Sequence, residues 1–225
     1  MKKRKTYQSI LDHYADCLHA HGDSHLGVDW PNETDAATRY RVMLECLRYQ
    51  PHATDCDLTV LDFGCGAAHL QDYIAKNGLV HVRYAGLDAV PEAIALSREK
   101  YPDTDFYLMD IVDTPDLLPD FDYIIMNGVF TEKRALSFDE MLAYFKTVLL
   151  LIFKKARKGV AFNVMSKAVD WERDDLFHLS TDMLISFLVK NLSRDFVIRN
   201  DYGLYEYTTY VYKDVDHGEG HYLWR

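Results

Sequence analysis

The chain has 225 residues, of which 48% are hydrophobic and 27% are charged. This length and balance are typical of one globular domain with a large core, and they exclude a disordered or low-complexity protein. The formal net charge of −10 and the lack of a basic stripe argue against a nucleic-acid partner, and no apolar run approaches the ~20 residues of a membrane span.

The first 50 residues show two stretches with apolar residues at helical spacing. The first stretch contains Ile10 and Tyr14, and the second contains Tyr40 and Leu44. Residues 21–34 between them are rich in Gly, Asp and Asn and contain one Pro, which indicates a loop. We therefore expect a helical cover at the N-terminus.

After this cover, the chain alternates between short apolar runs and helical patterns. The runs predict strands over 58–63, 82–88, 105–110, 121–127, 158–166, 195–201 and 206–213. The patterns between them predict helices over 67–77, 91–100, 137–156 and 180–192, with Ser137 as the cap of the third. Alternating strands and helices indicate βαβ units and a parallel sheet. The last two strands are separated by too few residues for a parallel crossover, so they must form a hairpin.

These patterns predict an α/β fold with a doubly wound, mostly parallel seven-stranded sheet, an antiparallel C-terminal strand and the N-terminal helical cover. We expect one structural domain, in which residues 1–50 form a lead-in or lid and residues 51–225 form a Rossmann-like core. No secretory signal follows the basic N-terminus. The four cysteines show neither a CxxC pair nor metal-ligand spacing, which favours reduced thiols, a cytoplasmic location and the absence of a bound metal.

The strongest local signal for function is the segment LDFGCGAAHL at 61–70. Asp62 precedes Gly64 and Gly66, and glycine is needed where a tight turn lets a ligand approach the backbone. A dinucleotide fingerprint requires a third glycine where this chain has His69. An acid directly before the glycines suits a cationic ligand and would repel a pyrophosphate. The turn therefore favours S-adenosylmethionine, which carries a sulfonium and an ammonium group, over a dinucleotide.

Two further acids end the next two predicted strands. Asp88 is placed to accept hydrogen bonds from both ribose hydroxyls, a role that fits either type of nucleoside cofactor. Asp110 is followed by Ile111, so a carboxylate for the adenine amino group stands beside an apolar side chain for the ring. The carboxyl ends of such strands form the ligand crevice of a doubly wound sheet.

In this order, VLDFGCG, YAGLD followed by PEAIALSREKYP, FYLMDI and FDYIIMNGVF resemble the motifs of class I S-adenosylmethionine-dependent methyltransferases. The resemblance extends over roughly residues 58–213 and implies S-adenosylmethionine as cofactor. It departs from the family at Ala68, where a third glycine is common. By the same resemblance, the cofactor-binding residues are Asp62, Gly64, Gly66, Asp88, Ala89, Asp110, Ile111 and Asn127.

Residues 21–47 are similar to the lead-in of a subgroup in which a loop and a helix cover the cofactor. The resemblance implies that an arginine of this helix binds the methionine carboxylate by a bidentate contact. Arg39 is the first choice and Arg41 the second. The alternative is an arginine that faces solvent.

The residues expected near the acceptor are Asn127 and His178. Family members that methylate adenine or glutamine amides have an Asn/Asp-Pro-Pro-aromatic motif where this chain has Asn-Gly-Val-Phe at 127–130. This difference argues against those substrates, and Asn127 is expected to contact the cofactor or orient an acceptor. In the loop 166–180, His178 is the candidate general base; the alternative is a histidine hydrogen-bonded near a helix start.

The overall resemblance is to methyltransferases of polysaccharide and natural-product gene sets. It implies a small-molecule acceptor, with a sugar or nucleotide-sugar hydroxyl first and an amino acid or another natural-product metabolite as the alternative. Two other functions stay open: a non-catalytic S-adenosylmethionine-binding protein and a dinucleotide-dependent oxidoreductase. The sequence carries no prediction of oligomeric state.

Overall fold

A seven-stranded sheet forms the centre of the molecule, with strand order β3-β2-β1-β4-β5-β7-β6. The computed structural model describes residues 5–49 and 57–213. The strands are β1 Leu58–Phe63, β2 Val82–Asp88, β3 Phe106–Leu108, β4 Phe121–Phe130, β5 Ala156–Met165, β6 Phe196–Arg199 and β7 Glu206–Tyr212. Strands β1 to β5 pair in parallel, whereas β7 pairs antiparallel with both β5 and β6. The predicted fold class and the predicted hairpin are confirmed.

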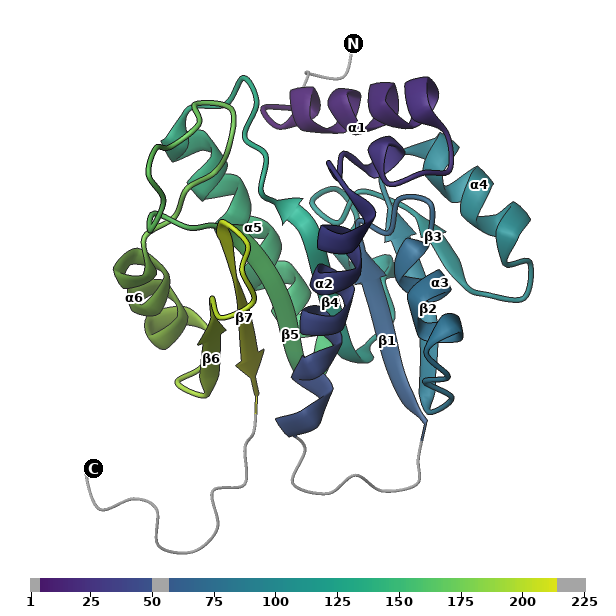
Figure 1. Ribbon diagram of the computed structural model, residues 1–225. Helices are drawn as coiled ribbons and strands as arrows, with labels where there is room; N and C mark the ends of the chain where they lie inside the picture. The colour runs from purple at the N-terminus through teal and green to yellow at the C-terminus, as the bar shows by residue number, and fades with distance from the viewer. Residues whose placement is uncertain (1–4, 50–56, 214–225) are drawn as a thin grey trace, which may run out of the picture.

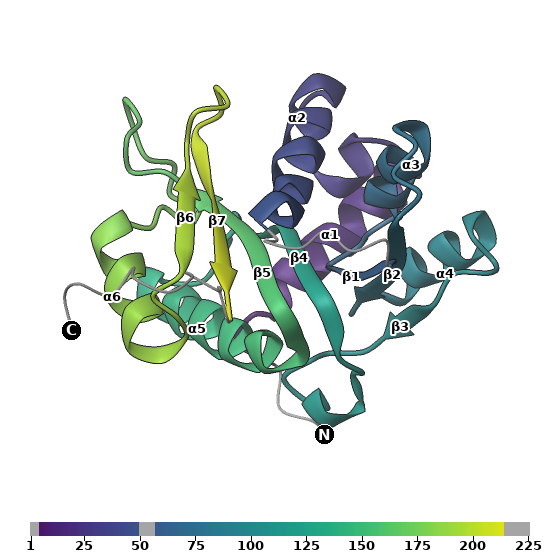
Figure 2. The same ribbon diagram turned by 90° about the horizontal axis from the view of Figure 1, so that it is seen from below.

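Helices cover both faces of this sheet, as Figure 2 shows from below. They are α1 Gln8–His21, α2 Glu33–Leu44, α3 His69–Lys76, α4 Pro91–Lys100, α5 Phe138–Lys155 and α6 Thr181–Asn191, with short 3₁₀ helices at Leu26–Val28, Glu45–Tyr49 and Pro115–Leu117. Helices α2, α3 and α4 lie on one face, and α5 and α6 lie on the other. Because both faces are buried, the strands read as nearly continuous apolar runs.

Strand β1 shows how alternate residues supply the two cores. Leu61 and Phe63 pack in the cluster that contains Phe145 of α5, and Val60 packs in the cluster that contains Met43 of α2. The cap that the sequence predicts for α5 is present as a capping box. Ser137 accepts a hydrogen bond from the backbone of Glu140, whose side chain accepts one from the backbone of Ser137.

Helix α1 lies across the top of the molecule in Figure 1, next to the edge where the parallel strands end. The chain then turns downward and runs into α2 on the sheet face. The predicted division at 50/51 lies outside the described residues and stays a prediction. No helix in the described ranges is long and apolar enough to cross a membrane.

Strand β4 differs from its predicted range, because it continues past Asn127 to Phe130. Its register against β5 shifts between Met126 and Phe130. Within this irregularity, the backbone N–H of Gly128 donates to the side-chain oxygen of Asn163 at 2.8 Å. The Asn163 side chain thus takes the place of a backbone acceptor in the β-ladder, so β4 continues toward the loop that follows.

Candidate active site

The turn after β1 has the backbone conformation for which glycine is suited. Gly64 has φ +78° and Gly66 has φ +52°. A Cβ at Gly64 would lie 2.8 Å from Val129, and one at Gly66 would lie 2.8 Å from Val28. Ala68 is also left-handed, with φ +58°, which explains why the family often has glycine there. Alanine accepts this conformation at a cost of roughly 1 kcal/mol.

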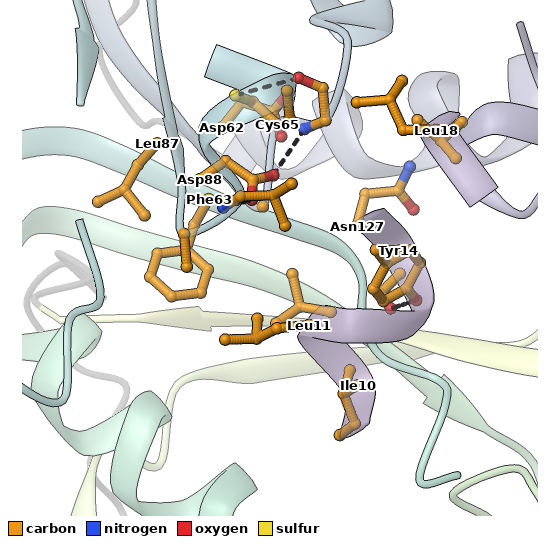
Figure 3. A pocket seen from close by; sticks show the side chains of 18 of the residues that line it. Ile10, Leu11, Tyr14, Leu18, Asp62, Phe63, Cys65, Leu87, Asp88 and Asn127 are labelled. Atoms are coloured by element: carbon orange, nitrogen blue, oxygen red, sulfur yellow. Dashed lines mark hydrogen bonds between the residues drawn. The ribbon is translucent and has the colours of Figure 1, made fainter. Parts of the chain in front are cut away.

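Asp62 and Asp88 lie beside this turn in Figure 3. Asp62 is 4% exposed and accepts a hydrogen bond of 2.9 Å from the Tyr84 hydroxyl. Burial raises the pKa of Asp62 to about 7, against the opposing effect of that hydrogen bond. Asp88 accepts backbone N–H groups of Gly66 and Val90, each at 2.9 Å. Burial also raises the pKa of Asp88, and these backbone donors oppose the shift.

Asp110, the third acid, is in contact with the beginning of the N-terminal cover. Its carboxylate accepts hydrogen bonds of 2.9 Å from the Tyr7 hydroxyl and from the Val112 backbone, and it forms an ion pair with Lys5. The ring of Tyr7 stacks on Tyr144 with centroids 4.4 Å apart. The strand end that carries Asp110 is therefore covered by residues that directly precede α1.

A narrow cavity of about 120 Å³ beneath α1 brings these groups together, and we call it the first cavity. Figure 3 shows α1 residues Ile10, Leu11, Tyr14 and Leu18 opposite the glycine turn and the strand ends. Eight residues predicted from the sequence line this cavity: Asp62, Gly64, Gly66, Asp88, Ala89, Asp110, Ile111 and Asn127.

A larger cavity of about 560 Å³, the second cavity, lies at the end of β4. Trp30 lines both cavities. Strand β4 and the residues after it also reach both, since Asn127 lines the first cavity and Glu132 the second. Two exposed aromatic side chains, Trp171 and Tyr205, belong to the lining of the second cavity. The structure therefore places a large polar and aromatic cavity next to the narrow one.

Arg39, which the sequence predicts to bind the methionine carboxylate, does not line the first cavity with the other eight predicted residues, and its cofactor role stays a prediction. It lines the second cavity, where its Nε donates to Glu206 at 2.9 Å and its guanidinium carbon lies 4.2 Å from the Trp30 ring centroid. Glu206 is 1% exposed, and a carboxylate this deeply buried needs a cation. Arg41, the second choice, pairs at 2.8 Å with Glu45, the first residue of the 3₁₀ helix that follows α2, and lines neither cavity.

A buried hydrogen-bond network joins the pair of Arg39 and Glu206 to the end of β4. Asn163 donates to Glu206 at 2.9 Å, and its side-chain oxygen accepts the N–H of Gly128. Gly128 has φ +82°, and a Cβ there would lie 2.8 Å from the Trp30 ring. Proline has no N–H and a fixed negative φ. This position therefore excludes proline, which explains why the chain lacks the Asn-Pro-Pro-aromatic motif.

His178 lines the second cavity, but both of its ring nitrogens contact the backbone. Its Nδ1 is 2.6 Å from the carbonyl oxygen of Ser166, and its Nε2 accepts the N–H of Arg173 at 3.2 Å. These contacts fit a neutral ring with the proton on Nδ1. The geometry favours the structural alternative for this histidine, and its role as a base stays a prediction.

Glu132 is a buried carboxylate of the second cavity that belongs to none of the motifs in the sequence. Glu132 is 9% exposed, and its Oε2 lies 3.0 Å from Nε of Arg134 but outside hydrogen-bond geometry. Burial raises the pKa of Glu132 to about 7, while Arg134 acts to lower it. The local sequence Thr-Glu-Lys-Arg has the composition of an exposed turn, so no local signal indicates that this glutamate is buried.

One group of side chains has the spacing of a metal site, namely His13, Cys17 and Asp29. The guanidinium of Arg134 contacts both His13 and Asp29. A cationic side chain thus already occupies the space beside these ligand atoms, and we assign no metal to them.

Comparison with known proteins agrees with the fold and the arrangement of strand ends. Residues 60–150 match a family model described as a methyltransferase domain. The chain has the fold of the class I S-adenosylmethionine-dependent methyltransferases, and the matched segment contains the glycine turn and the three strand-end acids. A putative methyltransferase of Mycobacterium tuberculosis is 29% identical over 160 residues, which are 69% of this chain and 93% of that protein.

Solved methyltransferase structures share this fold at low sequence identity. Magnesium protoporphyrin IX methyltransferase of Synechocystis PCC 6803, solved with bound S-adenosylmethionine, gives a TM-score of 0.64 at 13% identity. That comparison covers 95% of this chain and 100% of that chain. A methyltransferase of Leishmania major gives a TM-score of 0.60 at 13% identity, with 92% of this chain and 83% of that chain covered.

Proposed function

We propose that this methyltransferase holds S-adenosylmethionine in the first cavity and a small acceptor molecule in the second. The observation that carries the proposal is the meeting of three strand-end acids and the glycine turn around one cavity. A cavity of about 560 Å³ for the acceptor is within the ~300–1,000 Å³ typical of small-molecule sites.

The residues of the first cavity fit this cofactor part by part. The buried carboxylate of Asp62 favours the cationic methionine end, because a positive charge offsets the cost of ionising an acid in a buried position. Asp88 at the end of β2 suits the ribose hydroxyls, and Asp110 with Ile111 suits adenine. The left-handed glycines bring backbone rather than side chains against the ligand.

When bound, the cofactor supplies an electrophilic methyl group on its sulfonium. The chain's part is to align an acceptor with that methyl group and to keep water away from both. Asn127 and Gly128 stand where β4 leaves the first cavity, with Trp30 packed on Gly128 and lining both cavities. We assign the positioning of the transferred group to this part of β4.

We further propose that the acceptor is a hydroxylated small molecule, with a sugar or nucleotide sugar as the first choice. The second cavity combines hydrogen-bonding groups such as Arg39 and Glu132 with the aromatic side chains of Trp30, Trp171 and Tyr205. Aromatic faces pack on the apolar surface of flat rings, while the polar groups bond their hydroxyls. This combination suits a polar ring better than an aliphatic metabolite.

The test is a screen of sugars, nucleotide sugars, phenols, amines and amino acids, with detection of S-adenosylhomocysteine. We expect production with at least one hydroxylated compound and none when the acceptor is omitted. Binding of the cofactor without product from any compound would contradict the proposed transfer activity. Tight binding of NAD in place of S-adenosylmethionine would contradict the cofactor assignment.

A further inference from the structure

We propose that Glu132 is the general base of this methyltransferase and takes the proton of an acceptor hydroxyl in the second cavity. The inference rests on the proposed function and goes further, because it assigns the proton to one side chain. It also assigns the acceptor atom to an oxygen that carries a proton.

The position of Glu132 is the first argument. It lies just after β4, the strand that also carries Asn127 of the first cavity, and its side chain lines the second cavity. An isolated β-bridge to Leu176 fixes its backbone against the loop 166–180. Glu132 is thus held beside the acceptor cavity by the strand that leads there from the first cavity.

The unused hydrogen-bonding capacity of Glu132 is the second argument. Glu132 is nine-tenths buried, and its Oε2 is ion-paired with Nε of Arg134 at 3.0 Å but receives no hydrogen bond of good geometry from the described residues. A buried acceptor oxygen without a hydrogen bond costs about 1–3 kcal/mol, a cost that the ion pair with Arg134 offsets only in part. An acceptor hydroxyl would donate to this oxygen and satisfy it.

A second buried atom without a hydrogen bond, on Arg39 in the lining of the same cavity, points to the same class of acceptor. Nη1 of Arg39 is buried without a hydrogen-bond partner among the described residues, although Nε of the same side chain is bonded to Glu206. Glu132 thus offers an acceptor atom and Arg39 a donor atom. A molecule with one hydroxyl to donate and a second oxygen to accept satisfies both, as a polyhydroxylated ring does.

The charged surroundings of Glu132 suit a base that ionises near neutral pH. Burial raises the pKa of Glu132 to about 7, which is the range in which a general base is most effective. The ionisable groups that affect its charge, or are affected by it, come from α1, the loop after η1, the turn after β4 and the loop 166–180. They are Arg134, Arg173, Asp29, Asp175, Tyr14 and Cys17.

His178 is the other candidate base in this cavity, and its geometry is less suitable. Both of its nitrogens already contact the backbone of the loop that contains it. Taking a proton on Nε2 would cost the hydrogen bond from Arg173. Protonation of the Glu132 carboxylate would weaken its ion pair with Arg134, but Oε2 has no hydrogen bond among the described residues to lose.

The proton balance of the step is simple. The bond between the methyl carbon and sulfur breaks while a bond between that carbon and the acceptor oxygen forms, and the sulfonium becomes a neutral thioether. The hydroxyl proton moves to the Glu132 carboxylate and then to solvent when the product leaves. No oxidant, reductant or metal is needed.

The first experiment measures the ionisation of Glu132 itself and needs no acceptor. The protein is labelled with ¹³C at glutamate carboxyl carbons, and the Glu132 signal is identified as the one missing in Glu132→Gln. We expect this signal to titrate with a midpoint within one unit of 7. A midpoint in the ordinary range of glutamate, about 4.3, would overturn the proposal.

The second experiment compares turnover across pH 5.5–8.5 with the best hydroxylated acceptor from the screen. In the wild type, kcat should rise with pH through about 7, because the ionised carboxylate is the base. Glu132→Gln should lower kcat at least 100-fold and remove this rise, with the affinity for S-adenosylhomocysteine kept within threefold. The control is Glu172→Gln, which changes an exposed glutamate paired with Lys167 in the neighbouring loop; its kcat should stay within twofold.

Glu132→Asp covers the case in which the glutamine variant fails to fold. The shorter carboxylate should lower kcat at least tenfold while the rise with pH remains. Turnover of either folded variant near the wild-type level would overturn the role of Glu132. The role would also be overturned if the screen found amines or thiols to be acceptors and no hydroxyl compound. If the wild-type protein did not bind S-adenosylhomocysteine, that result would instead contradict the proposed function.

Discussion

At the scale of single residues, three carboxylates at strand ends line the first cavity, the proposed cofactor site. Asp62 and Asp88 are held by different partners, the Tyr84 hydroxyl for the first and backbone N–H groups for the second. Asp110 is paired with Lys5 of the N-terminal segment. The three acids therefore have different surroundings, and each proposed role has its own test.

Replacing Asp88 with alanine should weaken the binding of S-adenosylmethionine at least tenfold, about 1.4 kcal/mol or more. The variant loses the acceptor proposed for the ribose hydroxyls and also the link between β2 and Gly66. Titration calorimetry measures the effect, and thermal unfolding checks that the fold is kept. Asp103→Ala, an exposed acid away from both cavities, is the matched control and should bind as the wild type does. Unchanged affinity in Asp88→Ala would contradict the ribose assignment.

The raised pKa of Asp62 predicts that the affinity for S-adenosylmethionine depends on pH. The ionised carboxylate attracts the cationic cofactor, and with a pKa of about 7 its ionised fraction falls about tenfold between pH 8 and pH 6. The affinity for S-adenosylmethionine should therefore also fall from pH 8 to pH 6, as calorimetry at several pH values would show.

The same raised pKa affects the stability of the ligand-free protein. Asp62 contributes stability below about pH 4 that is lost as pH rises through about 7. Asp62→Asn should flatten both dependences; a variant with the wild-type pH dependence would contradict the role of Asp62.

At the scale of elements, α1 is the part of the fold that closes the cofactor cavity. Ile10, Tyr14 and Leu18 line the cavity at helical spacing, while the Tyr14 hydroxyl donates to the carbonyl of Gly128 at 3.1 Å. The space beneath α1 is about 120 Å³, so this helix has to move outward before a nucleoside enters. We infer that α1 opens to admit the cofactor and closes over it.

Hydrogen exchange of α1 should therefore slow when S-adenosylhomocysteine is added. A ligand that binds beneath the closed helix shifts the population away from open forms, from which the amides exchange. The decrease should be at least threefold in Gln8–His21, measured by mass spectrometry of peptides. Helix α6 (Thr181–Asn191), which lines neither cavity, serves as the internal control. Exchange in α1 that does not respond to saturating ligand would contradict the closing role of this helix.

At the scale of the whole molecule, local patterns in the sequence predict the elements but not all of their contacts. The apolar runs of β1 and β2 end where predicted, and the acids in their last residues, Asp62 and Asp88, meet at one sheet edge because parallel strands share a direction. The insertion of β7 between β5 and β6 leaves no mark in the local pattern, because strand order depends on contacts between distant segments.

The candidate site likewise contains residues that the sequence predicts and residues that it does not. Eight residues that line the first cavity could be predicted because each one stands at or next to a strand end or in the glycine turn. Arg39 was placed at the cofactor, but it is bonded to Glu206, which is 167 residues away along the chain. Glu132 gave no signal because its burial depends on the loop 166–180 that packs against it. Residues whose role depends on such distant partners need the structure.

The central claim is that the first cavity binds S-adenosylmethionine, and titration calorimetry on the purified wild-type protein tests it most directly. We predict saturable binding of S-adenosylmethionine and S-adenosylhomocysteine at one site per chain, with no binding of NAD under the same conditions. Absence of heat with both adenosyl compounds, in a protein that unfolds cooperatively, would contradict the claim.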